Sequence, residues 1–317
     1  MSRDTAPTVS IVSPMWNEAE AADHFLTALV ELVATLNTSC EILIVDDGST
    51  DGTAEILHSW QTRFPQLRVL SLSRNFGHQA AITAGVFAAR GDAVIVMDSD
   101  LQDPPSLIPQ MLEEWHQGAD VVYAVRKARS GETLFKRASA SLFYRLLGRL
   151  SSTPIPADTG DFRLMNRDVV EALRSMPERD RYMRGMVSWV GFRQVPVYFD
   201  RAERIRGETK YPLSKMIKLG TAGIVGFSDK PLYLAVTFGF AAMGLAFLGL
   251  LYVALSIIFG WGDLVRGWAS VVVAVMFFSA VQLIFLGVIG LYISRVFVEA
   301  KQRPLYIVKQ DSLVTPE

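Results

Sequence analysis

Two long stretches near the C-terminus carry no charged residue, and they limit what this chain can fold into more than any other feature. They cover residues 232–259 and 268–293. Each exceeds the roughly 20 apolar residues that an α-helix needs to cross a bilayer. Backbone groups in lipid must be hydrogen-bonded internally, so we predict that both stretches are transmembrane helices. The short link 260–267 makes them a hairpin.

Positive charge flanks this predicted hairpin at both ends. The flanking residues are Lys215, Lys218 and Lys230 before it and Arg295, Lys301 and Arg303 after it, and the link carries only Arg266. Lysine and arginine gather on the cytoplasmic side of membranes, so we expect a multi-pass protein of the inner (plasma) membrane with both termini in the cytoplasm. Glycines in both stretches suit close helix packing, which favours a homo-oligomer.

The first two-thirds of the chain alternates between short β-branched apolar runs and segments with helical spacing. The predicted strands are 9–14, 41–45, 68–72, 93–97, 120–125 and 195–199, and the predicted helices are 21–36, 53–64, 79–90, 107–117, 167–173 and 180–190. Strands that alternate with helices indicate βαβ units and a doubly wound, mostly parallel sheet. The sequence therefore predicts an α/β domain in front of the hairpin.

The strand at 93–97 breaks abruptly into a polar cluster containing Asp98, Asp100 and Gln102. Ligands of open α/β sheets bind outside the carboxyl ends of the strands, where this cluster is expected. Carboxylate and amide oxygens suit Mg²⁺ or Mn²⁺ held partly by substrate phosphates. The alternative interpretation is a solvated turn before Pro104 and Pro105.

Other strand ends are also polar. Asp46 and Asp47 follow the strand at 41–45, and ionised carboxylates can accept hydrogen bonds from a base or a ribose. A plain Asp-Gly turn is an equally good interpretation, and His78 is interpreted as a turn or helix-start residue. The chain contains neither the glycine fingerprint of dinucleotide sites nor that of P-loops.

Basic residues gather where a phosphate-bearing substrate is expected. The runs 126–129 and 201–211 are rich in arginine and lysine, and 134–150 and 212–230 read as basic amphipathic helices of a membrane interface. Solvated loops are the alternative for the two basic runs, and a core-facing helix is the alternative at 134–150. The net charge of −1 argues against a nucleic-acid partner, and the single cysteine, Cys40, excludes an internal disulfide.

These features together predict a nucleotide-activated donor in the cytosol and a phosphate-bearing acceptor in the membrane. A divalent ion would offset the charge of a leaving diphosphate. Six motifs then make the chain resemble one family. They are Pro14–Glu18, Asp46–Ser49, Arg74–His78, Asp98–Pro105, Gly160–Leu164 and Arg206–Tyr211. The chain resembles the family 2 glycosyltransferases of GT-A fold, specifically the polyprenyl-phosphate glycosyltransferases, which include dolichol-phosphate mannose synthases and bactoprenol glucosyltransferases.

The resemblance implies roles for particular residues. It implies that Pro14, Asn17, Glu18, Asp46, Asp47, Ser49, Asp98 and Ser99 hold the nucleotide sugar. It implies that Asp98, Asp100 and Gln102 bind Mg²⁺ or Mn²⁺. Acceptor phosphate would be held by Arg126, Arg206, Thr209 and Lys210, and Asp158 or Asp161 falls where the family has a candidate catalytic carboxylate.

The resemblance also implies a reaction, namely inverting transfer of one hexose to undecaprenyl or another polyprenyl phosphate. Glucose from UDP-glucose is favoured, with mannose from GDP-mannose or an aminopentose from its UDP donor as rival sugars. A non-catalytic membrane scaffold, a lipid-flipping partner and a nucleotidyltransferase are rival functions. The expected parts are a catalytic domain at 1–211, an interfacial helix at 212–230, a membrane segment at 231–297 and a cytosolic tail at 298–317.

Overall fold

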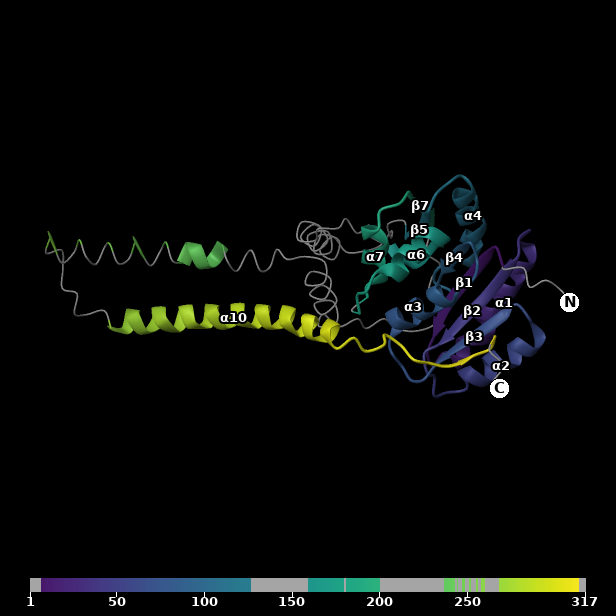
Figure 1. Ribbon diagram of the computed structural model, residues 1–317, viewed down its shortest axis with the longest axis horizontal. Coiled ribbons are helices and arrows are strands. Elements are labelled where there is room, and N and C mark those ends of the chain that lie inside the picture. Colours follow the sequence, from purple (N-terminus) through teal and green to yellow (C-terminus); the bar gives the residue numbers. More distant parts are fainter. Residues whose placement is uncertain are drawn as a thin grey trace, which may run out of the picture. The chain divides into compact units, whose positions relative to one another are not determined.

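The computed structural model describes residues 7–126, 159–179, 181–199 and 268–313, together with single helical residues and short helical runs between 237 and 259 (Figure 1). These residues belong to two compact units. The first contains the described residues up to Phe199 and from Gln302 onward, and the second contains those between 237 and 301. The helices predicted at 134–150 and 212–230 lie outside the described residues.

Among these residues, a mixed sheet of eight strands in the order β7-β5-β6-β4-β1-β2-β3-β8 forms the centre of the first unit. The strands are β1 Val9–Met15, β2 Cys40–Asp46, β3 Leu67–Leu72, β4 Ala93–Val96, β5 Val121–Arg126, β6 Thr159–Asn166, β7 Gln194–Phe199 and β8 Val308–Asp311. Parallel pairing joins β4, β1, β2 and β3, and it joins β5 to β7. The predicted α/β fold with a mostly parallel sheet is therefore confirmed in this unit.

Helices cover both faces of this sheet, which explains why β1, β2 and β4 are buried at every position. The helices are α1 Ala19–Thr35, α2 Thr53–Arg63, α3 His78–Ala88, α4 Ile108–His116, α6 Arg167–Ser175 and α7 Met183–Trp189, with a short 3₁₀ turn, η1 Pro105–Leu107, before α4. Side chains of α1, α2 and α4, such as Phe25, Leu57 and Met111, pack with Ile11 and Ile44 of the sheet in one core. Helix α3 packs on β1 and β2 so closely that a β-carbon at Gly85 would lie 2.3 Å from Cγ1 of Val12.

Two strands were not predicted from the sequence, and both are antiparallel. Strand β6 lies between β4 and β5, with Val96 opposite Arg163 in the register. Strand β8 comes from the segment expected to be a tail, and it pairs with β3 at the edge of the sheet (Figure 1). The guanidinium of Arg68 fastens this edge, because it donates hydrogen bonds to both carboxylate oxygens of Asp311.

The second unit contains one long helix, α10 Trp268–Ala300, which continues past the predicted end at Ile293. Its portion Phe277–Ala300 has a mean hydropathy of 2.0, and within the described part of the chain it is the one helix long and apolar enough to cross a membrane. The described residues between 237 and 259 are helical as well, but the predicted hairpin is not established by them.

Candidate active site

A cavity of about 270 Å³ opens where β1, β2 and β4 end. Its lining residues are Pro14, Met15, Trp16, Glu18, Asp47, Asn75, His78, Ala81, Asp98, Ser99 and Asp100. Six of the predicted binding residues are therefore brought together in one place, although they come from three separate parts of the chain, around the ends of β1, β2 and β4. Trp16, Asn75 and His78 line the same cavity and were not among the predicted site residues.

Three other predicted nucleotide-binding residues join loops to one another and are absent from the cavity lining. The Asn17 backbone N–H donates to Oγ of Ser49 (3.0 Å), and the Thr50 N–H donates to Oδ1 of Asn17 (2.8 Å). Oδ1 of Asp46 accepts the Ser49 N–H (3.0 Å). The contacts of Asn17 fix the loop after β1 against the loop after β2, and the contact of Asp46 with Ser49 holds the second loop itself.

Asp47 ties the floor of the cavity to the loop before α3. Its carboxylate accepts the backbone N–H groups of Phe76 (2.7 Å) and Gly77 (2.9 Å). Burial raises the pKa of Asp47, although these two hydrogen bonds oppose the shift. Gly48 follows with a φ of +67°, and a β-carbon there would lie 2.4 Å from the carbonyl carbon of Arg74. Only glycine fits where these two loops meet.

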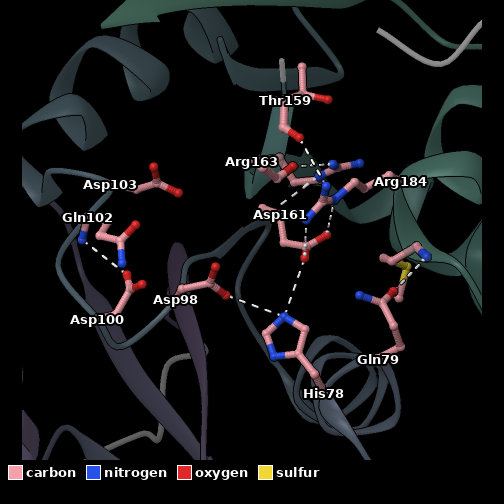
Figure 2. Close-up of polar contacts among 12 residues, drawn as sticks. His78, Gln79, Asp98, Asp100, Gln102, Asp103, Thr159, Asp161, Arg163 and Arg184 are labelled. Atoms are coloured by element: carbon pink, nitrogen blue, oxygen red, sulfur yellow. Dashed lines mark hydrogen bonds and ion pairs between the residues drawn. The ribbon is translucent and has the colours of Figure 1, made fainter. Parts of the chain in front are cut away.

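Three titratable side chains, His78, Asp98 and Asp161, meet beside the cavity, and the first two line it (Figure 2). Nε2 of His78, the first residue of α3, lies 3.4 Å from Oδ1 of Asp98 and 3.3 Å from Oδ2 of Asp161. Burial raises the pKa of Asp98 to about 6, against the opposing effect of His78. Burial also lowers the pKa of His78, but the hydrogen bond to Asp161 and the nearby carboxylate charges outweigh it and raise that pKa above its usual value.

Arg184 of α7 holds Asp161 in place. Its Nε and Nη2 donate to the two carboxylate oxygens of Asp161 at 2.8 and 2.9 Å, and its Nη1 donates to the Thr159 carbonyl at 3.1 Å. Burial alone would raise the pKa of Asp161, but the hydrogen bonds from Arg184 and His78 keep it well below its usual range. Asp161 is therefore a fixed negative charge and a weak base.

The other two predicted metal ligands lie on the opposite side of Asp98 from His78 in Figure 2. Asp100 is exposed, and its Oδ1 accepts the backbone N–H of Gln102 at 3.1 Å. Leu101 between them has a φ of 54°, so the chain turns back on itself here. Asp100 lines the cavity, whereas Gln102 is not among its lining residues.

The predicted acceptor-phosphate residues are only partly described. Arg126 ends β5, and its Nη2 lies 3.2 Å from Oδ1 of the buried Asp103. Its Nε is buried and has no hydrogen-bond partner. Asp158, Arg206, Thr209 and Lys210 lie outside the described residues.

The residues present fit a divalent cation. Oδ1 of Asp98 is buried and has no hydrogen-bond partner, which is costly for a carboxylate oxygen unless a cation faces it. His78, Asp98 and Asp161 each offer a ligand atom, and these three atoms lie within 4.8 Å of one another. Oxygen-rich sites with carboxylates are typical of Mg²⁺ and Mn²⁺.

Comparison with known proteins agrees with this geometry. Residues 10–174 match the model of glycosyl transferase family 2. The chain is 47% identical over 301 residues to YkcC of Bacillus subtilis, an uncharacterized glycosyltransferase, with 95% of this chain and 93% of the relative covered.

Two further relatives are named for an acceptor lipid. The chain is 41% identical over 303 residues to a prophage bactoprenol glucosyl transferase homolog of Escherichia coli K12, covering 95% of this chain and 98% of the relative. It is 40% identical over 304 residues to the bactoprenol glucosyl transferase of Shigella phage SfV, covering 96% of this chain and 98% of the relative. The chain therefore belongs to glycosyl transferase family 2, and it is a glycosyltransferase.

Proposed function

We propose that this glycosyltransferase transfers a single glucose, with inversion, from UDP-glucose to undecaprenyl or another polyprenyl phosphate at the cytoplasmic face of the membrane. The observation that carries the proposal is the cavity at the carboxyl ends of β1, β2 and β4, where Asp47, Asp98 and Asp100 come together. Relatives of similar length named bactoprenol glucosyl transferase support the choice of sugar and acceptor.

The donor fits the part of the cavity that Glu18 and Asp47 line. Trp16 is 51% exposed there and offers an aromatic face on which a base can stack. Carboxylates accept N–H and O–H hydrogen bonds, as a base and a ribose provide them. Asn17 and Ser49 join the two loops that carry this part of the pocket, and Asp46 holds Ser49 within its own loop.

Mg²⁺ or Mn²⁺ bound beside Asp98 would offset the charge that develops on the leaving diphosphate. Asp98 and Ser99 would bind the donor next to this ion, with Asp100 across from them. Arg126, together with Arg206, Thr209 and Lys210 as the resemblance implies, would hold the acceptor phosphate.

A phosphate acceptor is already ionised at neutral pH, so it needs positioning more than a strong base. Asp161 fits a positioning role, because Arg184 keeps its pKa low. Asp158 stays a prediction for the carboxylate that contacts the acceptor.

The position of strand β8 favours a membrane segment that begins and ends on the same side of the membrane. It belongs to the same sheet as β1–β7, although α10 precedes it in the chain. If α10 crosses the membrane, the chain must cross an even number of times between β7 and β8. The uncharged stretch 232–259 is long enough for the second crossing. We therefore propose a cytoplasmic catalytic domain at 1–211 that also includes β8, an interfacial helix at 212–230 and a two-helix membrane segment at 231–297.

The test uses the full chain purified in detergent with undecaprenyl phosphate and Mg²⁺ or Mn²⁺. UDP-glucose, GDP-mannose and a UDP-aminopentose are offered separately, and lipid mass and nucleoside diphosphate release are measured. We expect one hexose to be added from UDP-glucose alone, and activity to disappear with EDTA and in Asp100→Ala.

Asp92→Asn is the matched control, because this exposed carboxylate precedes the same strand β4 at its far end. It should transfer glucose like the wild type. A lipid product from another donor would overturn the choice of sugar, and no product from any donor would overturn the proposed acceptor.

A further inference from the structure

His78 lies next to two carboxylates, Asp98 and Asp161, where a divalent cation could bind. Its sequence position indicates only a turn or a helix start. Three separate elements supply the cluster, since His78 begins α3, Asp98 follows β4 and Asp161 lies in β6. Nε2 of His78 is 3.4 Å from Oδ1 of Asp98 and 3.3 Å from Oδ2 of Asp161. Neighbouring ligands of an octahedral ion at about 2.1 Å lie about 3 Å apart, so each carboxylate oxygen is already close to that distance from Nε2 of His78.

In the cluster of His78, Asp98 and Asp161, one carboxylate oxygen of Asp98 lacks a hydrogen bond. Its Oδ1 is buried without a hydrogen-bond partner, even though His78 lies next to it. Burial of a carboxylate oxygen without a hydrogen bond is costly, and a bound cation offsets this cost. Figure 2 shows this atom turned toward His78, away from Asp100 and Gln102.

Asp161 is already oriented for such a role. Arg184 fixes both of its oxygens at 2.8 and 2.9 Å, and a metal ligand that is held by a further hydrogen bond keeps its orientation and charge. The Asp161 side chain is only 4% exposed, so it cannot turn to solvent when an ion binds.

We propose that His78 is a direct ligand of the divalent cation, together with Asp98 and Asp161. This inference rests on the metal-dependent transfer proposed above, and it adds a nitrogen ligand to the all-oxygen set predicted from the sequence. The remaining positions of an octahedral ion are then open to water and to the donor diphosphate, because the cluster adjoins the cavity that His78 and Asp98 line. Because imidazole binds Mn²⁺ better than Mg²⁺, the site should favour Mn²⁺.

The test measures Mn²⁺ alone bound to the full chain in detergent, without nucleotide or lipid. Pulsed electron paramagnetic resonance detects the nuclear modulation of a directly bound imidazole nitrogen. We expect this modulation in the wild type and not in His78→Ala, with the Mn²⁺ affinity of the variant lowered about tenfold or more and its preference for Mn²⁺ over Mg²⁺ reduced.

His116→Ala is the matched control, because this exposed histidine ends α4 and does not line the cavity. It should keep both the modulation and the affinity. Wild-type protein that binds Mn²⁺ without nitrogen modulation would overturn the assignment, whether or not His78→Ala folds. Nitrogen modulation in a protein that transfers no sugar would instead overturn the proposed function and leave the ligand assignment intact.

Discussion

Arg184 and Asp161 form a two-point ion pair across the candidate active site, with Nε to Oδ1 at 2.8 Å and Nη2 to Oδ2 at 2.9 Å. Asp161 comes from β6, in the middle of the sheet, and Arg184 comes from α7. Oδ2 of the same carboxylate lies 3.3 Å from Nε2 of His78. Arg184 therefore orients Asp161 directly, and through Asp161 it orients His78.

Arg184→Lys should lower kcat about tenfold or more while leaving the affinity for UDP nearly unchanged. Lysine keeps the charge but cannot hold both oxygens, so Asp161 loses its fixed orientation. Losing a hydrogen bond to a buried carboxylate costs about 1–3 kcal/mol. Steady-state kinetics and UDP titration measure the two effects separately.

Arg174→Lys is the control for this change, since Arg174 donates to the Phe87 carbonyl at an exposed position outside the cavity. It should behave like the wild type. An equal loss of UDP affinity and kcat in Arg184→Lys would contradict the positioning role, because it would indicate general damage to the pocket.

Asp311→Asn should destabilise the protein at pH 7 by about 1–2 kcal/mol, and the difference from the wild type should shrink below pH 4. Burial alone raises the pKa of Asp311, but the hydrogen bonds and charge of Arg68 outweigh it and lower that pKa. A carboxyl with a lowered folded-state pKa adds stability above its unfolded pKa of about 3.9, and this stability is lost as the pH falls through the folded-state pKa.

Thermal unfolding from pH 7 to pH 3 measures this dependence. Lys309→Gln changes a charge on the same strand at an exposed position and should leave the profile unaltered. A destabilisation of Asp311→Asn that stays constant over the whole pH range would show that the ion pair with Arg68 is not its cause.

Gly48→Ala should weaken UDP binding and lower the melting temperature more than Gly191→Ala does. Both glycines have a positive φ, +67° and +79°, so both substitutions impose backbone strain. A β-carbon meets the backbone of Arg74 at 2.4 Å only at Gly48, whereas nothing lies within 4 Å at Gly191. Equal effects of the two substitutions would show that the contact between the loops after β2 and β3 is unimportant.

Cysteine labelling tests the proposed membrane topology. Cys40 is buried, and burial raises its pKa to about 11, so the wild type should react poorly with a membrane-impermeant maleimide. In intact cells Asp263→Cys, in the link before α10, should be labelled. Glu31→Cys on α1 and Lys309→Cys on β8, both exposed, should be labelled only after permeabilisation. Labelling of Lys309→Cys from outside would contradict an even number of crossings.

The sequence predicted the strands that contain a continuous apolar run and missed β6 and β8, in which charged or polar residues interrupt the run. Strands β1, β2 and β4 are buried on both faces, and their pattern shows it. Strand β6 contains Asp161 and Arg163, which are buried only because the fold provides partners for them. Strand β8 is short and mostly exposed, so no periodicity distinguishes it from a tail.

The sequence predicted the site residues that directly follow strands. It did not predict the site residues that helices contribute. Asp47, Asp98 and Asp100 follow parallel strands, and parallel strands end at one edge. His78 begins α3, beyond the loop that follows β3, so its sequence position indicated only a turn or a helix start, although that loop also leaves the carboxyl end of a parallel strand. Arg184 lies in α7, 23 residues beyond Asp161, and no local pattern marks it as that residue's partner.

Strand β8 also has a consequence for how the protein is made. Its residues leave the ribosome after both uncharged stretches, so β3 remains an open sheet edge until both stretches have been synthesised. In the proposed topology, a chain that inserts only one of these stretches carries residues 308–311 to the wrong side of the membrane. Such a chain cannot close its sheet and leaves that edge open to aggregation or proteolysis. In that topology, strand β8 makes completion of the catalytic domain conditional on correct membrane insertion.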